Sequence, residues 1–568
     1  MFSNLRLRRK KRKGNGVEIY PDEVMLDARN LPQFDRNQFE GRIEHPISRR
    51  VIAIAGGIFF IIGLIFLGKI WGLQVSQGEA FTIKSENNRL RHTVLFAERG
   101  VIYDREGKIL SYNEPPEEGD EFAHRGYTDT GGLSHILGYV KYPSKDSAGF
   151  YYKEDFEGVA GAELFFNDTL DGNNGLKIIE TNALGQISSE STIEPPKDGE
   201  NVTLSIDAEM QSELYLIIKD AMERANFDGG AGIVMDIETG EIIAMTSVPE
   251  YDSKILTEGK DREAISGFLT SPEKPFLNRA LNGLYTPGST VKPYMAIAAL
   301  DMDIINPEKN ILSTGSISIP NPYNPDMPTV FKDWKAHGLV DMRRAIAVSS
   351  NVYFYVIGGG YEDQKGLGIS NIDKYMDMFG FGSPIPYTDW LAGPAGVVPD
   401  PEWKKENFNG DSWRIGDTYH TSIGQYGFQI TPLQAVRAAG AIASSGNLVT
   451  PTLLKQEGEK KPDSIKIDLK EKDFQIVREG MRDAVLTGFV RGLLIPGVSV
   501  AAKTGTAELG VRKEYINAWV VGFFPYENPK YSFVVLMERG PVNTQIGGVH
   551  VSRQFLLWMA ENRPEYLK

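Results

Sequence analysis

The longest apolar run of the chain lies close to its N-terminus. Val51 to Gly68 contains 18 residues without a charge, and the run continues past Lys69 to Leu73. The long side chain of Lys69 can reach toward water from such a position. As a helix, residues 51–73 would be about 34 Å long, enough for a hydrocarbon core of ~30 Å. The alternatives are a cleaved signal peptide and a buried core helix. A signal peptide has a shorter apolar part, and no small-residue cleavage pattern follows. We predict one uncleaved membrane-spanning helix from the length and the flanking residues.

Residues 75–200 show short strand-like runs that are broken by Gly, Asn, Asp and Pro, such as "TVLFA", "GVIYD" and "KIIET". The stretch "VIYDREGKIL" predicts a hairpin with Glu106-Gly107 at its turn. No catalytic pattern occurs in this region, so we expect an extended, strand-rich spacer domain.

From about Asn201 the pattern changes. "AEMQSELYLIIKDAMERA" has apolar residues at helical spacing, and "GGAGIVMDIETGEIIAMTSV" predicts two strands with a tight turn at Thr239-Gly240. A helical middle follows. Near the end, "VSVAAKTGTAEL", "YINAWVVGFFP" and "YSFVVLMER" resemble strands, and "SRQFLLWMAEN" resembles a helix. Residues 201–568 are therefore expected to form an α+β domain, an antiparallel sheet with helices on its faces.

Charge and composition narrow the class of protein. The 568 residues are too many for one core. The net charge is −14, yet residues 1–13 carry seven basic side chains and no acid, so the other residues sum to −21. An acidic body argues against nucleic acid as a partner. The chain has no cysteine, which excludes disulfides, thiolate metal sites and a cysteine nucleophile.

The basic residues also predict topology. Arg49, Arg50 and the basic segment 1–13 all precede the apolar run. Positive residues favour the cytoplasmic side, so we expect a cytoplasmic tail over residues 1–50 and an extracytoplasmic chain after about residue 75. Residues 14–50 are polar and mixed in charge; a linker is the simpler interpretation, and a docking peptide is the alternative.

One stretch places a hydroxyl three residues ahead of an amine. In "YTPGSTVKPYMAIAAL", Ser289 precedes Lys292 by three residues and an apolar run follows. Pro293 is tolerated only if the helix starts near Ser289, since the first N–H groups of a helix have no intrahelical acceptor. Ser289 would then lie at the positive end of the helix dipole with Lys292 on the same face. A desolvated Lys292 is a plausible base; the simpler interpretation is a capping serine and a surface lysine.

The pattern S-x-x-K alone is weak evidence, because the chain repeats it at Ser271 and Lys274 without a long apolar helix behind it. Two further motifs support a functional interpretation only in combination with S-x-x-K at Ser289. "AVSSNVYFY" places Ser349 two residues before Asn351, although S-x-N also occurs at Ser85 and Ser445. A helix-terminal Ser/Asn pair is the simpler interpretation of this motif.

The third motif is K-T-G, which occurs once, in "AAKTGTAE". It gives Lys503, Thr504, Gly505 and Thr506. Gly505 in a strand would let another backbone approach as an added strand, and Lys503 with the two threonine hydroxyls could bind a carboxylate beside it. A surface lysine and a glycine bulge are the simpler interpretations.

Order and spacing favour function over these simpler interpretations. Ser289 and Ser349 are 60 residues apart, and Ser349 and Lys503 are 154 apart. This set resembles the penicillin-recognising serine acyl-transferases. "ERGVIYDREGKIL" and "GVAGAELFFNDTLDGNNG" are similar to the pedestal domain of class B penicillin-binding proteins, and "IGQYGFQITPLQA" and "INAWVVGFFPYENPK" to their transpeptidase domain. The resemblance covers roughly residues 75–568, and "FKDWKAHGLVDMRRAIAVSSNVYFY" looks like the elongation type, penicillin-binding protein 2, more than the division type.

The resemblance implies a fold and a chemistry. It implies a pedestal over residues 75–200 and a transpeptidase domain over 201–568 that includes an all-helical subdomain. It implies a D,D-transpeptidase in which Ser289 is the nucleophile, Lys292 the base, Ser349 a proton relay and Asn351 a holder of the substrate amide. Lys503, Thr504, Gly505 and Thr506 would line the binding strand, with the terminal carboxylate on Lys503 and the threonines. The backbone N–H groups of Ser289 and Thr506 would form the oxyanion hole.

Expected partners are peptidoglycan stem peptides, β-lactams as inhibitors, the membrane and a membrane glycosyltransferase of the elongation machinery. No cofactor is implied. Some elongation-type members bind a metal near the "DW…H" stretch with a cysteine; here Asp326, Asp333 and His337 remain without one, so we expect no metal. Between Leu110 and Gly138 only 27 residues intervene, fewer than the head insertion usual in the elongation type.

Three other functions are alternatives to a transpeptidase. A β-lactamase needs a water-activating group, and no E-x-x-L-N occurs between Ser349 and Lys503. A penicillin-sensing receptor has several membrane spans and a cytoplasmic effector domain. The sequence predicts neither, which argues against a receptor. The third rival is a non-catalytic scaffold that activates a membrane glycosyltransferase. The intact Ser289, Lys292 and Lys503 argue against it without excluding a second, scaffolding role.

Overall fold

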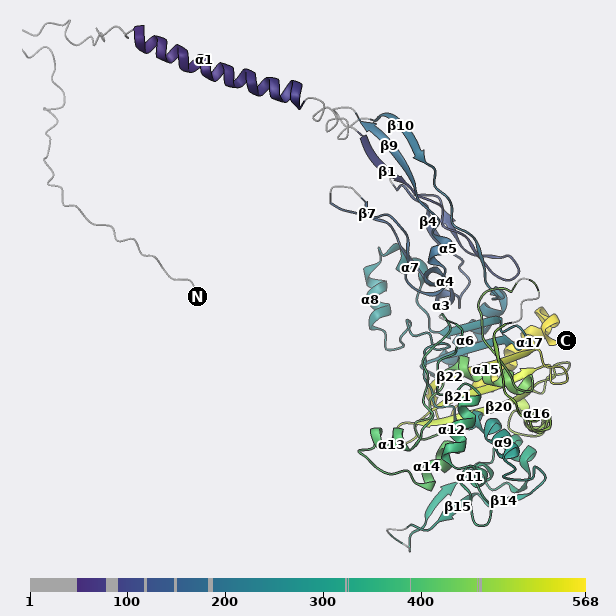
Figure 1. The fold of residues 1–568 in the computed structure, drawn as a ribbon. Coiled ribbons are helices and arrows are strands. Elements are labelled where there is room, and N and C mark those ends of the chain that lie inside the picture. Colours follow the sequence, from purple (N-terminus) through teal and green to yellow (C-terminus); the bar gives the residue numbers. More distant parts are fainter. Residues whose placement is uncertain are drawn as a thin grey trace, which may run out of the picture. The chain divides into compact units, whose positions relative to one another are not determined.

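A computed structural model describes residues 49–77, 90–116, 120–147, 151–181, 187–321, 324, 326–388, 390–456, 458 and 462–568 (Figure 1). The predicted basic segment 1–13, most of the polar tail (residues 14–48) and Ser85 lie outside the described residues. The chain divides into two compact units, residues 1–91 with 180–186, and residues 92–179 with 187–568. Each unit is described by itself.

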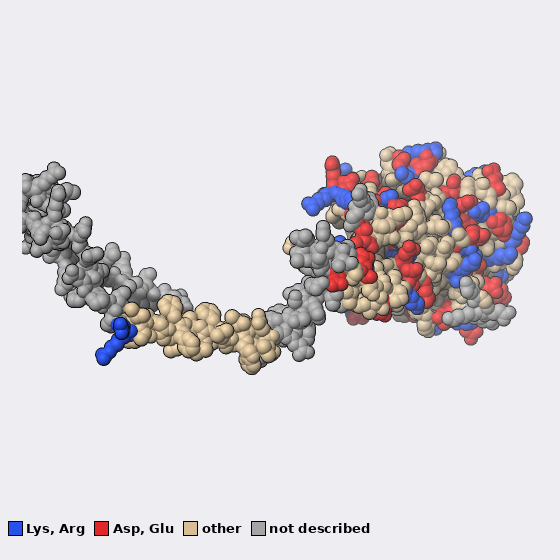
Figure 2. Space-filling view, turned by 90° about the horizontal axis from the view of Figure 1, so that it is seen from above, with Lys and Arg blue, Asp and Glu red and all other residues tan. Residues whose placement is uncertain are grey.

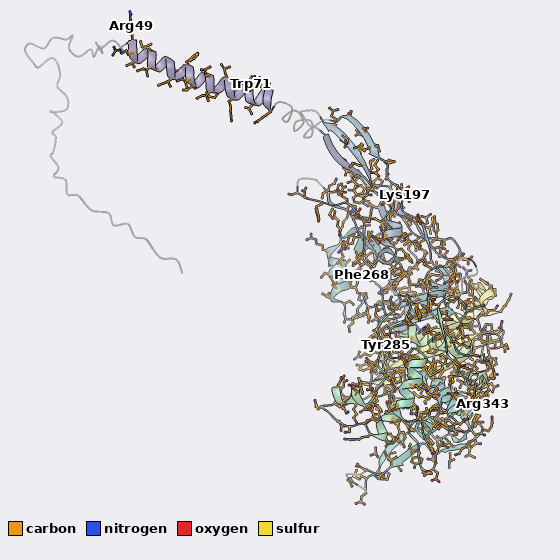
Figure 3. The ribbon with its side chains drawn as sticks, in the orientation of Figure 1. Arg49, Trp71, Lys197, Phe268, Tyr285 and Arg343 are labelled. Carbon is orange, nitrogen blue, oxygen red and sulfur yellow. The ribbon has the colours of Figure 1, made fainter. Side chains whose placement is uncertain are left out.

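The first unit contains one long apolar helix. α1 (Arg49–Trp71) has no buried residue and continues into a π-helical turn at Gly72–Ser76. Its side chains project outward on all sides between Arg49 and Trp71 (Figure 3), and its surface is largely uncharged after the basic residues of its first turn (Figure 2). Among the described residues, this is the one helix long and apolar enough to cross a membrane, over Arg49–Val75. The predicted span of residues 51–73 agrees with such an anchor.

The second unit begins with a strand-rich region. Its strands form two sheets, with the orders β1-β9-β10 and β11-β2-β3-β4, and two short pairs, β5-β8 and β6-β7. Three short helices, α3, α4 and α5, lie among them (Figure 1). The bounds are β1 (Leu90–Leu95), β2 (Ile102–Tyr103), β3 (Ile109–Glu114), β4 (His124–Tyr127), α3 (Ser134–Leu137), β5 (Val140–Lys141), β6 (Ser144–Lys145), β7 (Tyr151–Lys153), β8 (Glu157–Gly158), α4 (Gly161–Phe165), α5 (Asn167–Leu170), β9 (Gly175–Thr181), β10 (Ile187–Glu194) and β11 (Val202–Thr203).

The predicted hairpin is present in this region. β2 and β3 are antiparallel, and Gly107 at the turn has a φ of 84°, which favours glycine. The carboxylate of Asp104 accepts hydrogen bonds from the backbone N–H groups of Glu106 and Lys108 at 2.9 and 2.7 Å. An Asx-type turn at Asp104 therefore stabilises this hairpin turn in the absence of the favoured Asn-Gly pair.

A five-stranded antiparallel sheet forms the centre of the C-terminal domain. Its order is β13-β12-β22-β21-β20, which leaves β20 at an edge. The strands are β12 (Gly229–Asp236), β13 (Ile242–Val248), β20 (Ala501–Leu509), β21 (Tyr515–Phe524) and β22 (Tyr531–Pro541). The three terminal strands and the two strands joined at Thr239-Gly240 are thus where the sequence predicts them.

Helices cover both faces of this sheet. α6 (Ala208–Ala225) and α17 (Gly548–Asn562) pack on one face, and α15 (Pro432–Ala443) packs on the other with α16 (Glu471–Leu486) beside it. A helical group lies beyond α15 and α16 (Figure 1). Its helices are α9 (Lys292–Asp301), α10 (Met342–Val348), α11 (Asn351–Gly359), α12 (Ile369–Met378), α13 (Pro401–Asn407) and α14 (Ile415–Ser422). The predicted α+β class with a helical subdomain is confirmed.

The remaining elements are short and connect the larger ones. They are α7 (Ser253–Glu258), α8 (Arg262–Thr270), the pairs β14 (Ile311–Ser313) with β17 (Gly338–Val340), β15 (Ser316–Ile319) with β16 (Thr329–Lys332) and β18 (Asn447–Val449) with β19 (Ser464–Lys466), and the 3₁₀ turns η4 (Gly288–Val291), η5 (Arg491–Leu493) and η6 (Pro564–Leu567).

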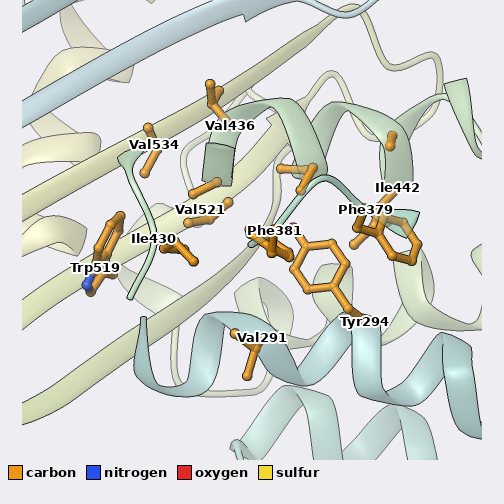
Figure 4. Close-up of a cluster of buried hydrophobic side chains, with 14 of the residues drawn as sticks. Val291, Tyr294, Phe379, Phe381, Ile430, Val436, Ile442, Trp519, Val521 and Val534 are labelled. Atoms are coloured by element: carbon orange, nitrogen blue, oxygen red, sulfur yellow. The ribbon is translucent and has the colours of Figure 1, made fainter. Parts of the chain in front are cut away.

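A continuous apolar core joins the sheet to the helical group. Side chains of α9 such as Tyr294 meet Phe379 and Phe381 from beyond α12, while Val521 and Val534 come from the sheet (Figure 4). Tyr294 packs against Phe379 and Phe381 with ring centroids 4.9 and 5.1 Å apart. Burying such a side chain contributes about 1.5–3 kcal/mol. The core therefore fixes α9, and with it the segment that starts at Ser289.

Candidate active site

Ser289 lies where a 3₁₀ turn leads into a helix. η4 (Gly288–Val291) runs directly into α9, and Pro293 occupies the first turn of α9, where no N–H donor is needed. Gly288 has a φ of 53°, and its N–H donates to the carbonyl oxygen of Gly424 at 3.0 Å. Ser289 is partly exposed, whereas its neighbours are buried. The predicted helix start is confirmed, with its first turn in the 3₁₀ form.

Lys292 is enclosed in the core beneath this turn. Its side chain is fully buried, and its ammonium donates to the carbonyl oxygen of Ser349 at 2.8 Å and to Oδ1 of Asn351 at 2.7 Å. The hydroxyl oxygen of Ser349 lies 3.3 Å away. Burial lowers the pKa of Lys292 to about 7, against a smaller raising effect of Asp333. Lys292 can therefore exchange a proton near neutral pH, as an ordinary surface lysine cannot.

Ser349 and Asn351 are held at a sharp turn between two helices. Ser349 has a φ of 57° at the end of α10, and Asn351 begins α11. The hydroxyl of Ser350 accepts a hydrogen bond from the N–H of Tyr353 at 3.3 Å and caps α11. The turn directs both Ser349 and Asn351 toward Lys292.

Asp333 supports the same turn, a role that the motifs do not reveal. Its Oδ2 accepts hydrogen bonds from the hydroxyl of Ser350 at 2.8 Å and from the N–H of Val352 at 2.9 Å. Burial alone would raise the pKa of Asp333. Hydrogen bonds from the backbones of Asn351 and Val352 and from Ser350, with the charge of Lys292, outweigh burial and hold this pKa below its usual range. Asp333 is thus a buried anion beside a buried amine.

Lys503 reaches the site from the edge strand β20. Its ammonium donates to the hydroxyl oxygen of Ser349 at 2.8 Å and to the carbonyl oxygen of Thr504 at 2.9 Å. Its side chain is 1% exposed, and burial, with the nearby charge of Lys292, lowers its pKa well below the usual range. Lys503 is therefore enclosed below the cleft, whereas Thr504 and Thr506 line the cleft itself.

Gly505 and Gly288 let two backbone segments, β20 and η4, meet beside Ser289. A Cβ on Gly505 would collide with the carbonyl oxygen of Pro287, and one on Gly288 would press on the backbone of Thr506. β20 and η4 can approach this closely only because Gly505 and Gly288 have no side chains. Gly505 therefore brings the backbone of Thr506 beside the Ser289 turn.

All these residues surround one cleft. Its volume is about 880 Å³, and its lining includes Ser289, Ser349, Asn351, Thr504 and Thr506. Lys292 and Lys503 lie beneath its floor, hydrogen-bonded to Ser349. The structure thus brings together the three motifs, which are far apart in the sequence.

The repeated motifs behave differently. Ser271 follows the end of α8, and Lys274 is exposed with a φ of 52°. The hydroxyl of Ser445 donates to Glu471 at 2.7 Å, on the surface after α15. Neither serine lines the cleft. Sequence context, not the short pattern, separates Ser289 from Ser271.

The "DW…H" stretch does not converge on a metal site. Asp333 Oδ1 accepts a hydrogen bond from the N–H of Trp334 at 2.9 Å, and His337 Nε2 lies 3.6 Å from the same oxygen. Asp326 is exposed. Among the described residues, no three His, Cys, Asp or Glu side chains are grouped as metal ligands would be. The residues present therefore do not fit the cysteine-containing metal site that the family resemblance raised.

The fold and site agree with comparisons to known proteins. Residues 230–555 match the family model of the penicillin binding protein transpeptidase domain, and residues 120–204 match that of the penicillin-binding protein dimerisation domain. The chain belongs to the penicillin-binding protein transpeptidase family. The expected order of a pedestal followed by a transpeptidase domain is confirmed.

Curated relatives and solved structures narrow the resemblance. The peptidoglycan D,D-transpeptidase MrdA of Acinetobacter baumannii is 28% identical, with 85% of each chain covered, and that of Escherichia coli K12 is 25% identical, with 88% of this chain and 92% of the relative covered. Pseudomonas aeruginosa PBP2 in complex with WCK 5153 is 27% identical, covers 84% of this chain and 98% of its own, and has a TM-score of 0.68.

Helicobacter pylori PBP2, solved in complex with MreC, is 26% identical, with 84% of this chain and 100% of that chain covered and a TM-score of 0.68. A chain from a peptidoglycan synthase complex is 25% identical, with 91% and 98% covered and a TM-score of 0.69. The expected resemblance to penicillin-binding protein 2 is confirmed.

Proposed function

We propose that this protein is a peptidoglycan D,D-transpeptidase that works through a serine acyl-enzyme. The observation that carries the proposal is the fully buried ammonium of Lys292, whose pKa is lowered to about 7, beneath the cleft that Ser289 lines. A lysine that loses its proton near neutral pH can serve as a base at that pH. Burial of a lysine disfavours its charged form, so a lysine with a purely structural role is not expected in this position.

The reaction begins at the hydroxyl of Ser289. Its oxygen attacks the carbonyl carbon of the penultimate D-alanine, and its proton passes to neutral Lys292. The oxyanion accepts hydrogen bonds from the backbone N–H groups of Ser289 and Thr506, which the close approach at Gly505 supports. Such donors are typically the largest electrostatic contribution to acyl transfer.

Collapse of the tetrahedral intermediate breaks the bond between the carbonyl carbon and the nitrogen of the last D-alanine. Ser349 delivers a proton to that nitrogen, and the hydrogen bonds of its hydroxyl with Lys292 and Lys503 at 3.3 and 2.8 Å provide the route. The amine of a second stem peptide then attacks the acyl-enzyme, gives up its proton along the same route, and frees Ser289.

Binding uses the other motif residues. The amide of Asn351 holds the peptide backbone of the donor, and the hydroxyls of Thr504 and Thr506 bind the terminal carboxylate above Lys503. Ionic hydrogen bonds of this kind contribute more than neutral ones. No cofactor is needed for any step.

Location and partners follow from the same proposal. α1 anchors the protein in the cytoplasmic membrane with a cytoplasmic tail over residues 1–50, a pedestal over 75–200 and a catalytic domain over 201–568 outside. The H. pylori relative was solved with MreC, and another neighbour in a peptidoglycan synthase complex. We expect an analogous assembly here, with a membrane glycosyltransferase.

The proposal is tested by mass spectrometry of the purified chain after incubation with a β-lactam. A stable adduct on Ser289, lost in Ser289→Ala and kept in the matched Ser271→Ala variant, is expected. Absence of an adduct on folded protein would instead favour the alternative function, a non-catalytic activator of a glycosyltransferase.

A further inference from the structure

A second hollow opens in the helical group, apart from the cleft that contains Ser289. Its volume is about 710 Å³, within the range of ~300–1,000 Å³ that is usual for ligand sites. It lies between the C-terminal end of α11, the first residues of α14 and the end of β15. α11 packs along α14 in this part of the molecule (Figure 1). None of the three sequence motifs contributes a residue to its lining.

A tight turn after α11 forms one side of the hollow. Tyr361 and Gln364 donate backbone hydrogen bonds to each other's carbonyl oxygens, both at 3.0 Å. The side-chain amide of Gln364 donates to the carbonyl oxygen of Ile304 at 2.8 Å, and its oxygen accepts a hydrogen bond from the ammonium of Lys309 at 2.8 Å. The rest of the protein therefore fixes this turn before any ligand binds.

Two carboxylates lie at the tip of the turn. Glu362 and Asp363 are exposed and line the hollow, and within the part of the chain that the structure describes neither forms an ion pair. Lys365 and Ser318 add an ammonium and a hydroxyl to the lining. These groups can exchange hydrogen bonds with a polar ligand. Since the carboxylates outnumber the ammonium, an anionic ligand such as phosphate is disfavoured.

Apolar groups complete the lining. Tyr361 is half-buried against the core, and Ile319 and Ile415 lie around it. The hollow thus combines one aromatic ring and two aliphatic side chains with several hydrogen-bonding groups. A sugar ring has the matching chemistry, an apolar C–H face surrounded by hydroxyl and amide groups. The lining therefore fits a neutral saccharide.

The hollow and the cleft share one wall. β15 pairs with β16, and Ile319 of β15 lines the hollow whereas Phe331 of β16 lines the cleft. Tyr419 lines the hollow, and its ring meets that of Phe331 edge-on, with centroids 4.9 Å apart. The ring of Tyr355, in the cleft lining, lies 5.7 Å from that of Tyr419. A single layer of rings therefore separates the two sites.

The distance between the two sites suits the substrate of the proposed function, on which this inference rests. α11 begins at Asn351, in the cleft lining, and ends at Gly359, in the hollow lining. Its nine residues span about 13 Å. Four residues of extended stem peptide, up to the reacting carbonyl, span about 14 Å. A stem that reacts at Ser289 is therefore long enough to place its sugar at the hollow.

We propose that the hollow binds the glycan strand, the chain of N-acetylated amino sugars that carries the donor stem peptide. The ring of Tyr361 packs against the C–H face of one sugar, and Glu362 and Asp363 accept hydrogen bonds from its hydroxyl and amide groups. The stem passes over Val330, an exposed residue of the cleft lining, to reach Ser289. Binding of the strand raises the effective concentration of the stem at the nucleophile.

The test compares two donors that contain the same pentapeptide, one free and one attached to an uncross-linked tetrasaccharide of the glycan. The full-length chain in detergent reacts with each donor, and the second-order rate constants are obtained from the release of D-alanine. The glycan-linked donor is expected to react roughly tenfold faster, the combined effect of one ring contact and one or two hydrogen bonds. The free donor is the internal reference, because it does not use the hollow.

Two variants test the residues of the hollow. Tyr361→Leu removes the ring and keeps an aliphatic side chain against the core, and it should reduce the ratio of the two rate constants to near one. Asp363→Ala removes an exposed carboxylate and should reduce the ratio by roughly threefold, the effect of one hydrogen bond. Tyr387→Leu and Asp468→Ala are the matched controls, since both residues are exposed and line neither the hollow nor the cleft. Their ratios should equal that of the unmodified chain.

Four outcomes overturn the glycan site. Equal rates for the two donors in the unmodified chain would exclude it, and so would an unchanged ratio in both hollow variants. Equal slowing of both donors in Tyr361→Leu would show a structural role only. A rate gain for glycan-linked acceptors, without one for glycan-linked donors, would assign the hollow to the other strand.

The exposed position of Asp363 keeps the test decisive should Tyr361→Leu fail to fold, because the ratio in Asp363→Ala then decides alone. Absence of any penicillin adduct on Ser289 is a different failure, that of the proposed function. A normal adduct with equal donor rates would overturn the glycan site and leave the proposed function intact.

Discussion

The ammonium nitrogen of Lys503 lies 2.8 Å from the hydroxyl oxygen of Ser349. Lys292 approaches the same oxygen to 3.3 Å. Two buried amines therefore share one hydroxyl, and each disfavours a positive charge on the other. In this arrangement Ser349 can pass a proton between them, and the variants below distinguish their separate tasks.

The first prediction concerns pH. In the proposed function Lys292 acts as a base in its neutral form only, and burial lowers its pKa to about 7. Neutral lysine accumulates as the pH rises through this value. The second-order rate of β-lactam acylation should therefore increase with pH to a midpoint near 7 and level off above it, measured by stopped-flow on the unmodified chain. A flat profile from pH 5 to 9 would refute Lys292 as the base.

The second prediction separates substrate anchoring from proton transfer. Lys503→Ala should slow acylation by carboxylate-bearing β-lactams and donor peptides by roughly tenfold, because Lys503 supports from beneath the floor the backbone of Thr504, whose hydroxyl binds the carboxylate in the proposed function. A small thioester without that carboxylate should be much less affected. Lys292→Ala should depress both reactions. If the two variants lose activity in the same pattern, the proposed division of roles is wrong.

The third prediction concerns Asp333, which acts through its neighbours. Its negative charge raises the pKa of Lys292, so Asp333→Asn should move the midpoint of the pH profile to lower pH. Asp333→Ala also removes the acceptor for Ser350 and Val352, and should slow acylation by about tenfold. Asp326→Asn, at an exposed position of the same stretch, is the control and should leave the profile unchanged. An unshifted midpoint in Asp333→Asn would show that the carboxylate does not tune Lys292.

The fourth prediction concerns topology. Residues 1–13, ahead of α1, carry seven basic side chains and no acid, and the acidic body follows α1. Protease added outside spheroplasts should digest the chain after residue 75 and spare a tag at residue 1, as judged by immunoblot. Loss of that tag in intact spheroplasts would show the opposite orientation.

Local patterns accounted for most of the fold. The helical spacing of residues 208–225, the strands of β12 and β13 and the three terminal strands all lie where their periodicity places them. These elements follow rules that act within a few residues. Pro293 likewise predicted a helix start, and Gly505 predicted a close approach of two backbones. Each reflects a local backbone requirement.

The contributions of Asp333 and Tyr426 could not be read from the sequence. Asp333 precedes the turn that it supports by 17 residues, and its hydrogen bonds depend on how β16 is placed beside α11. Tyr426 lines the cleft with a φ of 65°, and its sequence neighbours do not predict this conformation. Lys503 was predicted at the carboxylate, yet its position below the floor depends on which face of β20 it occupies, and tertiary packing decides that.

The glycines around Ser289 limit how this site can change. Gly288 and Gly505 leave no room for a side chain, and the buried lysines leave little for new bulk beneath the floor. Substitutions there would disable cross-linking together with drug binding. Antibiotic resistance arising in this protein is therefore expected at the cleft rim, where residues such as Val511 are fully exposed and a new side chain meets solvent. A surveillance effort that sequences resistant isolates would look first at the β20–β21 hairpin and at the segment around Tyr426.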